Sequence, residues 1–131
     1  MAATVQDIRD RLDALASTQV PDGVITAAIE DSTIFIDSVK TTDAASDLLD
    51  LAYKRYATYL SYLSYAEGIS MQRGGLPEIT KIKLDELRVV AEIMINKVAT
   101  EPVSLSVVAS GELQLGLPPI AGESESSAYI E

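Results

Sequence analysis

Hydrophobic residues in the first hundred positions recur every three or four residues, which is the spacing of one face of an α-helix. The pattern predicts an all-α fold, a small bundle of four helices, at residues 5–15, 22–39, 43–67 and about 78–99. The third is roughly 37 Å long at 1.5 Å per residue, and we expect it to form the spine of the bundle. The first helix presents the apolar stripe Val5, Ile8, Leu12 and Leu15, and the fourth presents Leu84, Leu87, Ala91, Met94, Ile95 and Val98.

Local signals mark the ends of these helices. Thr4 and Asp22 are candidate N-caps for the first two helices, and Gly68 is expected to end the third in the left-handed conformation that glycine adopts easily. The predicted loop at 68–77 contains three glycines and one proline, and its only charge is Arg73. We interpret the loop as a hinge, and Arg73 either as an ordinary exposed charge or as a channel or loop contact.

The pattern changes after Pro102, where hydrophobic residues begin to alternate with polar ones. The alternating residues are Val103, Leu105, Val107, Leu113, Leu115 and Leu117. Alternation is strand spacing, and an isolated pair of short strands is marginally stable in water. We therefore expect a helical domain at 1–100 and an extended, partly β C-terminal arm at 101–131, whose alternating residues bind a partner chain by strand addition. The alternative is a hairpin that turns at Ser110 and Gly111 and folds back on its own bundle.

Tyrosine recurs every third residue along the third predicted helix, at Tyr53, Tyr56, Tyr59, Tyr62 and Tyr65. Each three-residue step turns about 300° around the helix, so the rings drift around it and some should leave the core. We expect Tyr53 and Tyr56 to fill the bundle. Tyr59, Tyr62 and Tyr65 are candidates for a subunit interface, because tyrosine is enriched there. The alternative places them at the edge of the bundle with their hydroxyls in water.

Charge and composition narrow the function classes. The formal net charge is -10, and residues 101–131 contribute five Glu and no Lys or Arg, which argues against a broad electrostatic grip on DNA or an anionic membrane. The absence of Cys and His removes thiol nucleophiles, the usual general base and the commonest transition-metal ligands, so we expect no enzyme, metal or cofactor. No signal for export or membrane insertion is recognised, and cytoplasmic production is expected.

Two segments carry a resemblance to a known family. The stretch Val24-Ile25-Thr26-Ala27-Ala28-Ile29-Glu30-Asp31 and the stretch Asp47-Leu48-Leu49-Asp50-Leu51-Ala52-Tyr53-Lys54-Arg55-Tyr56 follow a short helix and a Pro-Asp break. In this order, residues 4–100 resemble the head-tail connector, or adaptor, proteins of tailed phages. The resemblance implies a virion protein at the head-tail junction, a dodecameric ring beneath the portal protein. It also implies that the C-terminal segment reaches the portal and that a tail or stopper protein docks below.

Two functional hypotheses follow from these observations. The first is a structural adaptor whose ring extends the DNA channel, with an acidic wall past which DNA slides without specific binding. The second is an acidic DNA mimic or inhibitor that occupies a basic surface on a host protein. The mimic needs its charge in one patch, whereas Asp and Glu are spread over all four predicted helices with Arg and Lys between them.

Overall fold

The computed structural model describes residues 3–105, and within this range the chain is helical. Its five helices are α1 (Val5–Arg11), α2 (Ala14–Gln19), α3 (Asp22–Val39), α4 (Ser46–Arg73) and α5 (Glu78–Asn96). The all-α prediction for the body is therefore confirmed. The strand predicted for the arm lies mostly outside the described residues, and residues 102–105 form neither a helix nor a strand.

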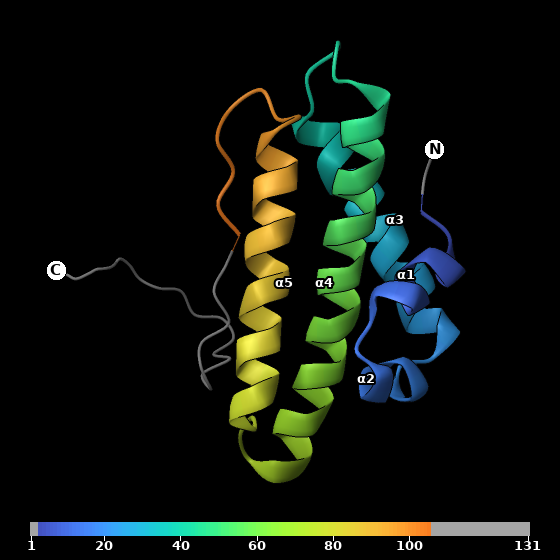
Figure 1. Cartoon of the computed structure of the whole chain (residues 1–131), viewed down its shortest axis with the longest axis vertical. Coiled ribbons are helices and arrows are strands. Elements are labelled where there is room, and N and C mark those ends of the chain that lie inside the picture. The colour runs from blue at the N-terminus through green and yellow to red at the C-terminus, as the bar shows by residue number, and fades with distance from the viewer. Residues whose placement is uncertain (1–2, 106–131) are drawn as a thin grey trace, which may run out of the picture.

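Helix α4 is the central element of the bundle. It packs antiparallel to α5 on one side, and on the other side it contacts α3, α1 and α2 (Figure 1). Helices α3 and α5 both run antiparallel to α4 and therefore run in the same direction as each other, and they lie on different sides of α4. The expectation that this helix is the spine of the bundle is confirmed.

The predicted first helix is divided into two, which corrects the single helix expected at 5–15. Leu12 is buried but has an extended backbone, so the chain turns there and α2 begins at Ala14. The Arg9 guanidinium holds this corner, donating to the backbone oxygens of Ser17 at 2.6 Å and Val20 at 2.8 Å. The turn exposes Leu15, which was expected on the buried stripe.

The N-cap predicted for the first helix is present in the structure, and the N-cap predicted for the second is not. The Thr4 hydroxyl accepts from the backbone N–H of Asp7, and the Asp7 carboxylate accepts from the backbone N–H of Thr4, which completes a capping box. Asp22 is not an N-cap as predicted. Pro21 has that position, and Asp22 is the first residue of α3, where its carboxylate pairs with Arg9.

Helix α4 continues past the predicted end at Gly68 and finishes at Arg73. The left-handed residue is Gly74, with a φ of 75°, and its N–H donates to the Ser70 oxygen. Gly68 lies inside the helix with a helical backbone, where glycine costs about 1 kcal/mol relative to alanine. The predicted loop of 68–77 is thus reduced to 74–77, and Arg73 lies exposed in the last helical turn.

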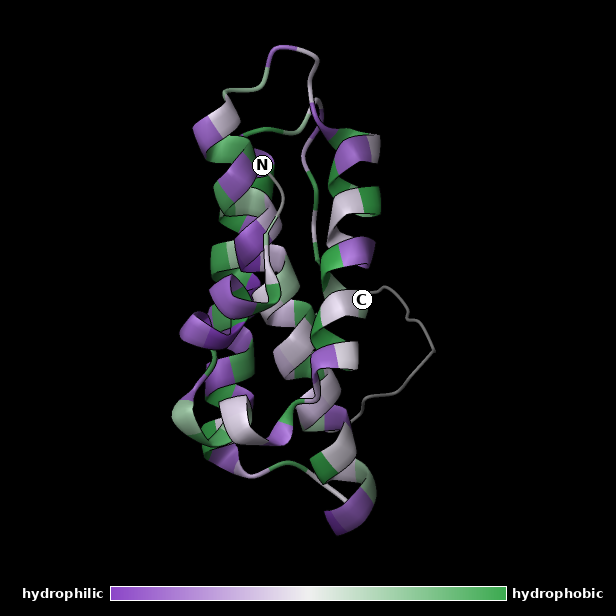
Figure 2. Ribbon diagram, turned by 90° about the vertical axis from the view of Figure 1, so that its right-hand side faces the viewer, coloured by the Kyte–Doolittle hydropathy of each residue, from purple (hydrophilic) through white to green (hydrophobic). Residues whose placement is uncertain are grey.

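The core is built around the central helix, which neighbouring helices cover on several sides. Along α4, small residues that are completely or almost completely buried let the neighbouring helices approach: Ala52, Ala57, Ser61 and Ala66. Leu60 and Leu63 are half-buried and pack against this core. Hydrophobic and hydrophilic residues alternate along the helices in Figure 2, as amphipathic packing requires.

Backbone hydrogen bonds join the ends of α3 and α5 at one end of the bundle. The Thr41 N–H donates to the Val98 oxygen at 2.8 Å, and the Thr100 N–H donates to the Val39 oxygen at 2.8 Å. Lys40 and Ala99 thereby form an isolated antiparallel bridge. This bridge fixes the direction in which the chain leaves the helical body toward the C-terminal arm (Figure 1).

Candidate protein-protein interface

Helix α5 has two hydrophobic stripes on opposite sides, and only one is covered. An α-helix turns about 100° per residue, so residues three, four and seven apart share a face. The inner stripe faces α4 and is buried: Leu84, Leu87, Ala91 and Ile95. The other stripe, called here the α5 outer face, is exposed in the described structure: Ile79, Ile82, Val89, Val90 and Ile93. A surface helix normally presents polar residues on this side.

Charged residues are interspersed on the α5 outer face. Lys83 follows Ile79 by one helical turn, Glu86 lies between the two ends of the stripe, and Lys97 follows the last turn on the same side. Neither lysine forms an ion pair within the described residues, unlike Arg88, which pairs with Asp85 and Glu92 on the flank of the helix. The face is therefore apolar with a slight excess of positive charge in a strongly acidic chain.

The start of the C-terminal arm is anchored to its own bundle. The Asn96 side-chain amide donates to the Val103 oxygen at 3.0 Å, and its oxygen accepts from the Val103 N–H at 2.7 Å. Val103 packs against the core and Leu105 is buried in it. These two predicted partner-binding residues thus contact their own subunit. The other four, Val107, Leu113, Leu115 and Leu117, lie outside the described residues.

The tyrosine ladder is largely internal, which corrects the expectation that its later members leave the core. Tyr59 and Tyr62 are only 4% and 3% exposed, whereas Tyr56 and Tyr65 are half-buried. The rings drift around α4 as predicted, but α4 is enclosed by helices on several sides, so the drift does not bring Tyr59 and Tyr62 to the surface. Of the three proposed interface tyrosines, only Tyr65 offers a substantial exposed surface in the described structure.

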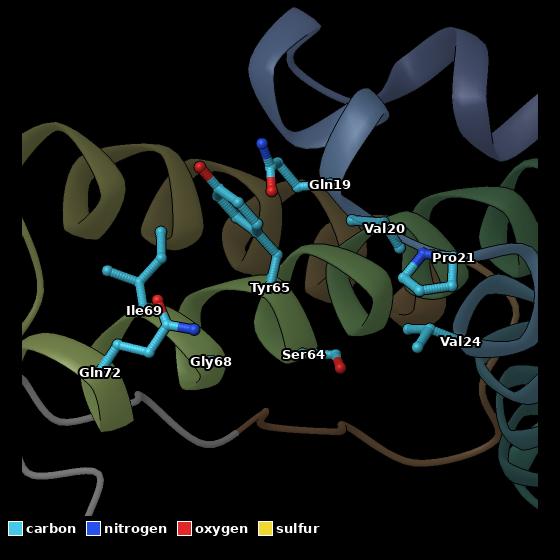
Figure 3. Close-up of a pocket in the computed structure, with 9 residues that line it drawn as sticks. All are labelled: Gln19, Val20, Pro21, Val24, Ser64, Tyr65, Gly68, Ile69 and Gln72. Carbon is cyan, nitrogen blue, oxygen red and sulfur yellow. The ribbon is translucent and has the colours of Figure 1, made fainter.

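Tyr65 lines a pocket at the end of the bundle where α2 leads into α3 (Figure 3). The pocket has a volume of about 200 Å³, and the side chains of Tyr65 and Gln19 point toward one another across it. Val20, Pro21 and Val24 form its apolar side, and Ile69 and Gln72 from α4 continue it. Its lining contains no charged group, and its size suits a single side chain of a partner better than a cofactor.

Several carboxylates of the described residues form ion pairs or hydrogen bonds with neighbouring side chains. Tyr53 donates to Asp37, which also pairs with Lys40, and this hydrogen bond holds the pKa of Asp37 below its usual value. Burial and the same bond raise the pKa of Tyr53 to about 12, and burial raises the pKa of Tyr59 to about 12. No group of three or more potential metal ligands occurs among residues 3–105.

No protein-family model, curated protein or solved structure matches the chain. None of the described helices is long and apolar enough to cross a membrane.

Sequence reasoning missed the α5 outer face, although the signal was present. The inward stripe accounts for six hydrophobic residues of the predicted fourth helix, and Ile79, Ile82, Val89, Val90 and Ile93 remain unassigned. Plotting these at about 100° per residue places them together, opposite Leu84 and Ala91. A second hydrophobic stripe on a surface helix departs from the usual polar outer side.

Proposed function

We propose that this chain is the subunit of a head-tail adaptor ring in a tailed phage, where it joins the portal protein to the tail and extends the DNA channel. The observation that carries this proposal is the α5 outer face, whose aliphatic side chains remain exposed in the isolated subunit. Contiguous exposed apolar surface on a small protein marks a site of association. The resemblance of residues 4–100 to phage adaptors supplies the class of assembly.

The C-terminal arm contributes the second contact of the proposed adaptor, toward the portal. Asn96 and Leu105 hold its first residues on the bundle, so the part available to a partner begins after Leu105. Val107, Leu113, Leu115 and Leu117 would pair with the portal or an adjacent subunit by strand addition. In this arrangement the bundle forms the ring, and the arm, anchored at a defined position on it, reaches a neighbouring protein.

The charge distribution suits a channel component better than an acidic mimic. Several carboxylates of the described body already have basic partners, including Asp22 with Arg9, Asp37 with Lys40 and Asp50 with Lys54. Pairing reduces the field that a mimic of DNA would present to a basic protein surface. The remaining negative charge would let DNA slide through a ring without gripping its phosphates.

The deciding experiment is native mass spectrometry and electron microscopy of the purified chain, alone and mixed with the portal protein of the virus that encodes it. We expect a ring of many copies, stacked coaxially on the portal in the mixture. Arg73, a candidate channel contact, would then be located relative to the ring axis. If the chain is instead a small monomer that does not bind the portal protein and competes with DNA for a basic protein, the adaptor proposal is wrong and the DNA-mimic hypothesis is supported.

A further inference from the structure

The outer surface of α3 is the counterpart of the α5 outer face in chemistry and in position. Helix α3 contains four acidic residues and no Lys or Arg. Glu30, Ile34 and Asp37 follow one another at four- and three-residue spacing and so share one face, opposite the buried Ile25 and Ile36. Ile34 is 69% exposed, which leaves a large aliphatic side chain uncovered among carboxylates. We call this surface the α3 acidic face.

We propose that the α5 outer face of one copy docks on the α3 acidic face of a second copy, which makes the subunit contact head-to-tail. The proposal rests on the ring proposed above and names the two surfaces that would form it. Because α4 separates α3 from α5, the two surfaces point to different sides of the subunit and cannot satisfy each other within one chain. A contact between two different surfaces leaves one of each free, so further copies can add, and the assembly closes into a ring when the rotation between neighbouring copies divides a full turn.

Charge complementarity selects this pairing over the two symmetric ones. Lys83 and Lys97 have no ion pair within the described residues, and neither does Glu30 on the α3 acidic face, whereas Asp37 on that face already pairs with Lys40. Two α3 acidic faces would bring unpaired Glu30 side chains together, and two α5 outer faces would bring unpaired lysines together, so both symmetric pairings place like charges side by side. The net charge of -10 adds a general repulsion between copies, so a contact requires local attraction of this kind.

The geometry of the two helices also fits. α3 and α5 comprise 18 and 19 residues, and they run in the same direction within the subunit. If the ring axis is parallel to these helices, rotation about it keeps them parallel in every copy. The α5 of one copy would therefore lie beside a parallel α3 of similar length in the next copy. Ile34, which is exposed in the subunit, would insert among the aliphatic residues of the α5 outer face, with Glu30 near Lys83, while the aliphatic stems of the lysines cover the rim.

A complementation experiment tests the proposal with two variants of the full chain. The first variant, Ile82→Ser with Ile93→Ser, disables the α5 outer face and keeps the α3 acidic face. The second, Ile34→Ser with Glu30→Lys, does the reverse. All four side chains are exposed in the subunit, so both variants should fold, which circular dichroism and thermal melting verify. Met71→Ser, which removes an exposed apolar residue outside both surfaces, is the matched control and should assemble like the wild type.

The expected result, followed by sedimentation velocity and native mass spectrometry, is that each variant alone is a monomer and that the mixture forms a 1:1 heterodimer. A second variant that still dimerises alone would show a symmetric α5 contact, and a first variant that still assembles would show another surface; either result overturns the proposal. Charge reversal sharpens the test. Lys83→Glu and Glu30→Lys should each weaken association roughly tenfold or more, and the two together should recover most of it.

The wild-type protein separates failure of this interface from failure of the proposed function. A wild-type ring that survives both double substitutions refutes the docking of α5 on α3 but leaves the adaptor standing. A wild type that stays monomeric at every concentration, with portal present as well, refutes the ring and this contact together.

Discussion

Helices α4 and α5 pack against each other, yet they differ in how their side chains are covered. In α4, polar and small residues such as Ser61, Thr58 and Tyr62 are buried, because helices surround it on several sides. In α5, large aliphatic residues such as Ile79 and Ile93 are exposed, because only one side of the helix is covered. Burial in this bundle therefore follows the position of the helix more than the hydrophobicity of the residue. The group of aliphatic residues left exposed on α5 by that position is the surface on which the proposed subunit contact rests.

The largest expected effect contrasts the two stripes of α5. Ile95 is completely buried against α4, whereas Ile93 is 52% exposed on the outer face. We expect Ile95→Ala to lower the free energy of unfolding by about 2–5 kcal/mol, because it removes transfer energy and leaves a cavity. We expect Ile93→Ala to change it by no more than about 0.5 kcal/mol in the monomer.

Urea unfolding at a dilution where the protein is monomeric measures both values. Equal losses for the two variants would mean that the α5 outer face is already covered in the single subunit. The α5 outer face would then be unavailable to a second copy, and the proposed subunit contact could not form there.

The difference between α4 and α5 also explains what the sequence predicts well and what it does not. Three- and four-residue spacing predicts that these helices exist and which residues of α5 face inward, because that information is local. The burial of Tyr59 and Tyr62 depends on how many neighbours α4 has, and one helix's own periodicity does not contain that number. The exposure of Leu15 depends on the turn at Leu12, which Arg9 stabilises through residues 8 and 11 positions away.

Helix ends are the other feature that local reasoning places poorly. Gly68 and Gly74 are both candidates to end α4, and the sequence favours the first one reached. In the structure the helix ends at Arg73, with Gly74 as its C-cap, and Ile69 and Gln72, which line the Tyr65 pocket, lie on the helical turns beyond Gly68. The α5 outer face could have been recognised from the sequence, but its proposed counterpart on α3 could not. The positions of α3 and α5 on different sides of α4 are a property of the fold.

A second prediction concerns the arm, which begins on the α5 side of the bundle. Truncation after Glu101 removes the burial of Leu105, the packing of Val103 and the paired hydrogen bonds to Asn96. We expect it to lower the free energy of unfolding by about 1–3 kcal/mol. Truncation after Leu105 keeps these contacts and should leave the stability nearly unchanged.

Thermal melting of the two truncated proteins tests this, with portal binding as the second measurement. Both truncations should abolish incorporation into the portal complex if residues 106–131 make that contact. A large loss of stability on truncation after Leu105 would instead mean that the arm covers its own bundle, with the α5 outer face as the first surface to consider.

A third prediction uses the enclosed tyrosines of α4. The pKa of Tyr53 and that of Tyr59 are raised to about 12, so both hydroxyls stay protonated in the folded protein while those of the unfolded chain ionise near 10. Their contribution to stability is fully present below pH 10 and is lost as pH rises from 10 to 12. We expect the urea midpoint to fall over this interval and to fall less steeply in Tyr59→Phe.

Absorbance at the tyrosinate wavelength gives an independent measurement. Part of the tyrosine signal should appear only near pH 12, and Tyr53→Phe and Tyr59→Phe should each remove one residue's share of that late signal. If all tyrosines titrate together near pH 10 while the protein is still folded, α4 is more accessible than its position between α3 and α5 implies.

The smallest expected effects come from two glycine substitutions that locate the C-terminal end of α4. Gly68 has a helical backbone with open space around its Cα, so Gly68→Ala should raise the free energy of unfolding by about 0.5–1 kcal/mol. Gly74 also has open space, but its φ of 75° is unfavourable for residues with a Cβ, and Gly74→Ala should lower stability by about 1 kcal/mol. Opposite signs for two glycine substitutions six positions apart would place the helix end between them. If Gly68→Ala is the destabilising change, α4 ends about 1.7 turns earlier, and the segment with Ile69 and Gln72, which lines the Tyr65 pocket, is not helical.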